Sequence, residues 1–118
     1  MNYKPHHTAL SVRNLEKSLE FYKLFGYEQV HRYDEADGSL STVHLKLGGS
    51  FLEIVAYKKN EDKPPIDYGF ANNIEDIGVK HIAIQSDDIE AALADMRSKG
   101  LATDETKIIF GRTKVSYF

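Results

Sequence analysis

The sequence contains no cysteine and no tryptophan among its 118 residues. Without cysteine there can be no disulfide bond and no thiolate metal site, so any bound metal must use histidine, aspartate or glutamate. No apolar run approaches the roughly 18 residues that a membrane-spanning helix needs. The first residues, MNYKP, also lack the apolar stretch of a secretory signal. We therefore expect a cytoplasmic protein with no membrane partner.

Positive charge is neither abundant nor clustered in this chain. The chain contains 15 Lys and Arg residues and 18 Asp and Glu residues, which gives a formal net charge of −3. This balance lacks the basic footprint of a nucleic-acid-binding protein. The chain also lacks a phosphate-binding glycine loop, a nucleophile elbow and a dinucleotide fingerprint. The length of 118 residues suits a single domain.

An internal repeat organises the chain. Residues 7–27 align with residues 81–101 without a gap, at an offset of 74 positions. Two segments that share a strand–helix pattern can match by chance, but the gapless register and the matched histidines favour a true repeat. Five positions are identical in the two copies: His7/His81, Ala9/Ala83, Glu16/Glu90, Leu19/Leu93 and Gly26/Gly100.

Each copy predicts a strand, a capped helix and a glycine stop. Residues 6–12 and 80–86 alternate between polar and apolar side chains, as a strand with one covered face does. Asn14 and Asp88 follow, and both residue types are favoured helix N-caps. Apolar residues at helical spacing come next, and the shared glycine then stands where a helix end needs a left-handed residue. The aliphatic side of each strand should pack on the helix, which leaves the histidine on the opposite face.

Further strands are predicted after each helix. In the first copy they cover residues 28–33, 42–47 and 51–57, separated by glycine-containing turns. In the second copy they cover residues 106–110 and a segment from 113 onward. The first copy therefore reads strand–helix–three strands, and the predicted fold class is α+β.

Three residues form the candidate site: His7, His81 and Glu53. Glu53 stands among apolar neighbours in the strand 51–57, and a buried carboxylate without a partner costs several kcal/mol. All three residues are predicted on the strand face opposite the aliphatic one. Two imidazoles and a carboxylate suit a divalent metal ion such as Zn, Ni, Mn or Fe(II). The alternative is an edge-strand glutamate exposed to solvent and two ordinary polar histidines.

The other histidines are weaker candidates. His6 should point to the face opposite His7, because neighbouring residues of a strand alternate, and a structural or surface role is expected. His31 and His44 lie on predicted strands of the first copy and could line a pocket, but nothing in the sequence fixes their position.

At these residues the chain resembles the vicinal oxygen chelate superfamily, which includes glyoxalase I, methylmalonyl-CoA epimerase, extradiol dioxygenases and bleomycin-resistance proteins. HTALSVRNLEKSLEFY is similar to the opening strand and helix of that family, FLEIVAY to its ligand-bearing fourth strand, and GVKHIAIQSDDIEAAL to the start of its second module. The resemblance implies one domain of two βαβββ modules that form a curved mixed sheet. Module one would be residues 5–57, the connector 58–79 and module two 80–118.

The resemblance also implies a site and its partners. Carried over, the ligands of a divalent metal are His7 and Glu53 from the first module and His81 from the second. The expected partners are a small-molecule substrate and a second copy of the chain in a homodimer. The repeat offset carries Glu53 to position 127, past Phe118, so the second module lacks its last strand and the family's fourth ligand. We expect this to reflect truncation.

The chemistry that the family shares is chelation of substrate oxygens by a metal acting as a Lewis acid. The leading expectation is a metal-dependent lyase or isomerase similar to glyoxalase I. In it Glu53 is a ligand that doubles as the base, with the missing second-module carboxylate an equal candidate for that role. Ser11 stands where glyoxalase I has an arginine, and the chain reads Val55-Ala56-Tyr57 where that enzyme has an asparagine, which argues against glutathione as substrate. Two alternatives stay open: an extradiol-type Fe(II) dioxygenase, and a metal-free binding protein of the bleomycin-resistance type.

Overall fold

The computed structural model describes residues 1–64, 77–79, 81–104, 106, 108–110 and 114–116. The chain divides into two compact units, Met1–Ile66 and Asp67–Phe118. The boundary between them falls inside the predicted connector. Within the described ranges, no helix combines the length and the apolar character that crossing a bilayer requires.

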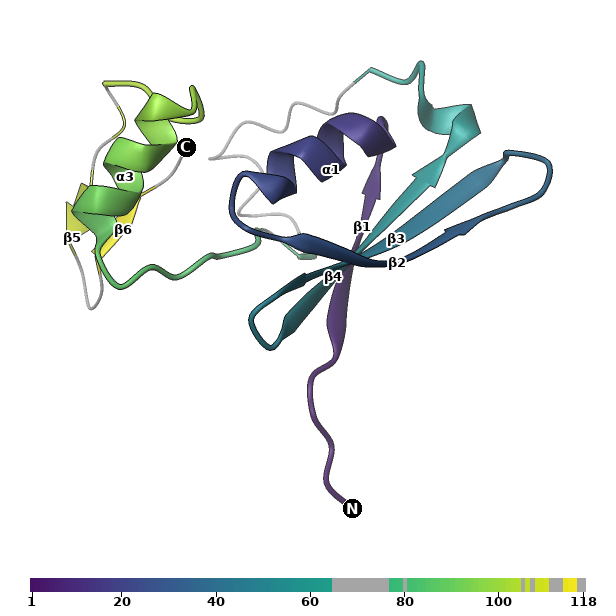
Figure 1. The fold of residues 1–118 in the computed structure, drawn as a ribbon, viewed down its shortest axis with the longest axis horizontal. Helices are drawn as coiled ribbons and strands as arrows, with labels where there is room; N and C mark the ends of the chain where they lie inside the picture. The colour runs from purple at the N-terminus through teal and green to yellow at the C-terminus, as the bar shows by residue number, and fades with distance from the viewer. Residues whose placement is uncertain (65–76, 80, 105, 107, 111–113, 117–118) are drawn as a thin grey trace. The chain divides into compact units, whose positions relative to one another are not determined.

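The first unit has the predicted βαβββ order. It consists of β1 (His7–Val12), α1 (Leu15–Lys23), β2 (Glu28–Asp34), β3 (Leu40–Leu47) and β4 (Ser50–Tyr57), followed by the 3-10 turn η1 (Lys58–Asn60). The four strands form one mixed sheet in the order β1-β4-β3-β2, with β1 parallel to β4 and the other pairs antiparallel. Figure 1 shows α1 lying over one face of this sheet. Because β1 pairs with the last strand rather than the next one, residues near either end of the unit become neighbours.

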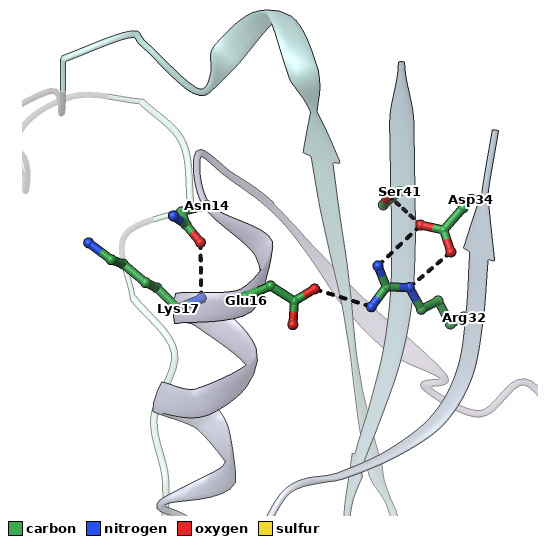
Figure 2. Close-up of polar contacts among 6 residues, drawn as sticks. All are labelled: Asn14, Glu16, Lys17, Arg32, Asp34 and Ser41. Carbon is green, nitrogen blue, oxygen red and sulfur yellow. Dashed lines mark hydrogen bonds and ion pairs between the residues drawn. The ribbon is translucent and has the colours of Figure 1, made fainter. Parts of the chain in front are cut away.

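Local signals start and stop α1 where the sequence predicts. Asn14 has extended backbone angles, and its side-chain oxygen accepts a hydrogen bond from the backbone N–H of Lys17 at 3.0 Å (Figure 2). This bond satisfies one of the N–H groups that the first turn of a helix leaves free. After the helix, Gly26 adopts a φ of 92°. A side chain there would be strained, so the glycine lets the chain turn back toward β2.

The core of the first unit lies between α1 and the aliphatic face of the sheet. Val43 and Ile54 are fully buried, and Leu45 and Leu52 are each 3% exposed. These four residues alternate with half-buried or exposed neighbours along β3 and β4, which confirms the predicted face assignment. The opposite face contains no fully buried side chain on these strands. Among the described residues of the first unit, that face is therefore uncovered.

A polar cluster ties α1 to the edge of the sheet (Figure 2). The Arg32 guanidinium of β2 donates to both carboxylate oxygens of Asp34, at 2.9 and 3.3 Å, and to Glu16 of α1 at 3.3 Å. Ser41 of β3 also donates to Asp34. The hydrogen bonds from Arg32 and then Ser41 lower the pKa of Asp34 below its ordinary value, and the same pairing raises the pKa of Arg32. All of these side chains contact solvent, so the cluster contributes orientation more than stability.

The second unit contains α3 (Ile89–Ser98) and the antiparallel pair β5 (Ile108–Phe110) and β6 (Lys114–Ser116). The side chain of Asp88 caps α3 by accepting from the backbone N–H of Ala91 at 3.0 Å, as Asn14 does for α1. Leu93 and Met96 of α3 are buried, and Gly100 has a φ of 72°. The capped helix and the glycine stop predicted for the second copy of the repeat are therefore confirmed.

The strand predicted at residues 80–86 is not present in the described part of that segment. Residues 81–86 carry no strand assignment. In the first unit, β1 is a strand because it pairs with β4 along its whole length. Among the described residues, none is paired with segment 81–86 as β4 is paired with β1. The prediction of a strand at the described residues 81–86 was therefore wrong, although the alternating pattern is present in the sequence.

Candidate functional site

The candidate site of the first unit lies on the uncovered face of the sheet. In the parallel pair, His7 is opposite Phe51 and Ala9 is opposite Glu53, so His7 and Glu53 are one diagonal step apart on the same face. His7 Nε2 lies 3.8 Å from Glu53 Oε2. The His7 side chain is 37% exposed and the Glu53 side chain 24% exposed. The structure thus brings together two of the three predicted site residues, from positions far apart in sequence.

Glu53 has a closer partner in His44. The antiparallel register of β3 and β4 places these residues directly opposite each other. His44 Nε2 lies 2.6 Å from Glu53 Oε2, which is a hydrogen bond between two partly buried side chains. The carboxylate that the sequence marks as unusual is therefore neither free nor simply solvated. It stands between two imidazoles, one bonded to it and the other just beyond hydrogen-bond distance.

One further ring, that of His31, extends this cluster along the sheet. A bulge between Gln29 and His31 in β2 shifts the register so that His31 lies opposite His44. The ring centroids of His31 and His44 are 5.8 Å apart, and those of His7 and His44 are 5.6 Å apart. The uncovered face consequently carries the imidazoles of His31, His44 and His7 next to one another, and the carboxylate of Glu53 is hydrogen-bonded to the middle one.

The prediction that His6 points away from His7 was wrong. His6 Nδ1 lies 2.8 Å from His7 Nδ1, and the His6 ring stacks on Phe51 with centroids 5.2 Å apart and an interplanar angle of 8°. His6 precedes β1, which begins at His7, so the alternation of a strand does not apply to it. Its ring folds onto the same face as the site and touches the ring of His7.

His81, the third predicted ligand, belongs to the second unit and is exposed in an irregular segment. Its role as a ligand stays a prediction. Within the part of the chain that the structure describes, no group of three or more His, Asp or Glu side chains is placed to hold a metal ion. The first unit supplies two predicted ligands, and the predicted set needs the second unit to complete it.

His44 is the functional candidate that the sequence did not single out. A signal for it was present in the Gly48-Gly49 pair between the two strands. If these glycines form a two-residue hairpin loop, Leu47 pairs with Ser50, and counting back places position 44 opposite position 53. The observed register follows that count, and Gly48 has a φ of 57°.

Comparisons with known proteins agree with this architecture. The family model described as the Glyoxalase/Bleomycin resistance protein/Dioxygenase superfamily matches residues 4–115. The mitochondrial methylmalonyl-CoA epimerase of Homo sapiens is 30% identical over 105 residues, which cover 86% of this chain and 58% of that protein. The lactoylglutathione lyase of Schizosaccharomyces pombe is 30% identical over 115 residues, covering 85% of this chain and 38% of that protein. The chain therefore spans less than two thirds of the length of either relative.

A solved structure shows the same fold. The glyoxalase family protein from Enterococcus faecalis superposes with a TM-score of 0.70 at 23% identity, over 90% of this chain and 79% of that one. At that identity the likeness concerns the arrangement of helices and strands.

Proposed function

This chain belongs to the Glyoxalase/Bleomycin resistance protein/Dioxygenase superfamily, and we propose that it is a divalent-metal-dependent lyase or isomerase that moves a proton on a small oxygen-bearing substrate. The observation that carries this proposal is the convergence of His7 and Glu53 on the uncovered face of the first module, with Nε2 and Oε2 3.8 Å apart. Family membership by itself supports an enzyme of this general kind. The reaction and the metal are the proposed part.

The geometry of this pair fits a metal ion. Zinc binds imidazole nitrogen at about 2.0–2.1 Å and carboxylate oxygen at about 2.0–2.2 Å, so two such ligand atoms lie at most about 4.3 Å apart, when they are on opposite sides of the ion. The 3.8 Å separation of His7 Nε2 and Glu53 Oε2 falls within that limit. Both side chains are partly exposed on an uncovered face, so an ion has access to them. The donor set is also acceptable to Ni, Mn and Fe(II).

His81 is the proposed third ligand. It occupies the position in the second copy of the repeat that His7 occupies in the first. With two imidazoles and one carboxylate, the ion would keep coordination positions open for substrate oxygens. The pairing of the two modules, within one chain or across a homodimer, is part of the same proposal.

The proposed chemistry assigns separate tasks to the ion and to the protein. When bound, a divalent metal acts as a Lewis acid and polarises a substrate carbonyl. Glu53 is then the carboxylate placed to accept the proton from the neighbouring carbon and to return it. The uncovered sheet face receives the substrate, and the half-buried strand residues beside Glu53 limit the access of water to it.

The relatives suggest the substrate class. An epimerase acting on methylmalonyl-CoA and a lyase acting on lactoylglutathione are both named for substrates with a thioester. In each case the mobile hydrogen is on the carbon beside a carbonyl. We therefore propose that this chain removes a proton from the carbon next to a thioester or ketone carbonyl. Ser11 in place of the arginine of glyoxalase I, and Val55-Ala56-Tyr57 where that enzyme has an asparagine, favour an acyl thioester over the glutathione adduct.

Deuterium exchange tests the proposal. The protein is loaded in turn with Zn, Ni, Mn or Co and incubated in D2O with methylmalonyl-CoA or with the glutathione–methylglyoxal adduct. NMR then follows loss of the α-hydrogen. We expect exchange with at least one pairing, reduced about 10²–10⁴-fold in the isosteric variant Glu53→Gln, which lacks the proton acceptor. Exchange with no pairing, or unchanged exchange in Glu53→Gln, would contradict the proposal.

The two alternatives give different results in parallel measurements. A ring-cleaving dioxygenase would consume oxygen with catechols after anaerobic loading with Fe(II). A metal-free binding protein would hold less than about a tenth of an equivalent of transition metal and would gain no activity when metals are added.

A further inference from the structure

We propose that His44 is a positioning residue for Glu53: its imidazole donates Nε2–H to Oε2 and fixes the orientation of the carboxylate. The proposal deepens the proposed function, because it takes from it the role of Glu53 as ligand and base. It rests on the 2.6 Å contact between these atoms and on the strand register that produces it.

The register of β3 and β4 places the side chain of Glu53 directly beside that of His44. His44 and Glu53 are opposite residues of an antiparallel pair, whose side chains project on the same face about 5 Å apart at Cβ. The two side chains are 27% and 24% exposed, so solvent competes only partly for the bond. An ionised carboxylate only accepts hydrogen bonds, so the contact requires the proton to be on Nε2 of His44. The other imidazole near Oε2 is that of His7, at 3.8 Å, too far for a hydrogen bond.

The hydrogen bond from His44 makes the two carboxylate oxygens of Glu53 different from each other. Among the described residues, no hydrogen bond is formed to Glu53 Oε1, whereas Oε2 is held by His44. A carboxylate free to rotate would present either oxygen to a metal or substrate, and each productive encounter would need to select one orientation. Hydrogen-bonded partners behind metal ligands orient them in this way, and their loss typically weakens metal binding 10–100-fold.

Neighbouring rings hold His44 in place and provide a control. The rings of His31 and His7 flank it, with centroids 5.8 and 5.6 Å away. His31 lies opposite His44 on β2 and has no hydrogen bond to Glu53 within the described residues. Removing the imidazole of His31 therefore changes the ring cluster while leaving the bond between His44 and Glu53 available.

The first test is a cobalt titration of the metal-free full chain, followed by visible absorption. We expect His44→Phe, which keeps a ring but no donor, to raise the Kd for Co²⁺ about 10–100-fold. His44→Gln, whose amide nitrogen can reach the position of Nε2, should recover most of the affinity. The control His31→Phe should bind as the wild type does. Wild-type affinity in His44→Phe, or an equal loss in His31→Phe, would overturn the proposal.

The second test does not depend on metal. Long-range ¹H–¹⁵N NMR of the metal-free protein, on the alkaline side of neutrality, reports which imidazole nitrogen of His44 carries the proton. We expect the Nε2–H form in the wild type. The same form should be retained in His31→Phe, and the His44 ¹⁵N resonances should shift in Glu53→Gln. A His44 ring in the Nδ1–H form would overturn the proposal. A wild-type protein that binds no cobalt but shows the Nε2–H form would contradict the proposed function and leave the positioning role standing.

Discussion

His7 and Glu53 lie on the parallel strands β1 and β4, with Nε2 and Oε2 3.8 Å apart on the uncovered face of the sheet. The sheet order β1-β4-β3-β2 makes this possible, because it places the first strand of the unit beside the last. The same face would carry the substrate. The stability of the first unit comes from the opposite face, so residues of the site and residues of the core can be altered separately.

Truncating Ile54 should destabilise the fold strongly. Its side chain is fully buried between α1 and the sheet, and Ile54→Ala should lower the free energy of unfolding by about 2–5 kcal/mol. The control is Val30→Ala on β2, where the side chain is 51% exposed and the change should stay within about 0.5 kcal/mol. Urea titration followed by circular dichroism measures both. Equal effects in the two variants would show that the assigned core is wrong.

The two helix N-caps, Asn14 and Asp88, should contribute about equally to stability. Asn14→Ala and Asp88→Ala each remove a side-chain oxygen that accepts from the first turn, and each should cost about 1 kcal/mol. Hydrogen exchange locates the effect, which should be greatest at the amides of Lys17 and Ala91. Asn2→Ala, in the exposed N-terminal segment, is the control and should change neither. Unaltered protection of both amides would refute the capping role.

Acid should weaken the cluster around Asp34. Its pKa is lowered in the folded protein by Arg32 and then by Ser41, so below the ordinary aspartate pKa of about 3.9 the unfolded chain binds more protons than the folded one. The stabilisation is therefore present at neutral pH and is lost as the pH falls through the folded-state pKa. Asp37, whose pKa is lowered by Ser39, acts in the same direction.

Urea midpoints measured between about pH 6 and about pH 2 should show this acid dependence. The slope should be smaller in Asp34→Asn than in the wild type. The exposed Asp62→Asn is the matched control and should retain the wild-type slope. A slope in Asp34→Asn that is indistinguishable from the wild-type slope would contradict the role assigned to the cluster.

Much of the fold follows from short-range signals in the sequence. Asn14 and Gly26 bound the first helix because capping and positive φ are properties of single residues and their immediate neighbours. Glu53 could be recognised because a carboxylate among apolar strand residues needs a partner. That partner, His44, could be found only by fixing the hairpin register through Gly48-Gly49, since a one-residue shift would turn it to the other face.

Features that depend on distant pairing were harder to predict. The segment 81–86 has the alternation of a strand and the same pattern as β1, but none of the residues that the structure describes is paired with it, and it has no strand assignment. His6 was placed on the wrong face because β1 begins one residue later than predicted. In both cases the local pattern was read correctly and the hydrogen-bonding partner decided the outcome.

We propose that His7, Glu53 and His81 bind one divalent metal ion, and metal analysis of the protein purified without an affinity tag measures this binding. We expect about one equivalent of a first-row metal in the wild type. His81→Ala should lose that metal while its circular dichroism spectrum stays unchanged, and His31→Ala should retain it fully. Unchanged metal content in His81→Ala, or a wild-type protein that binds none of the metals offered, would show that these three residues do not form a metal site.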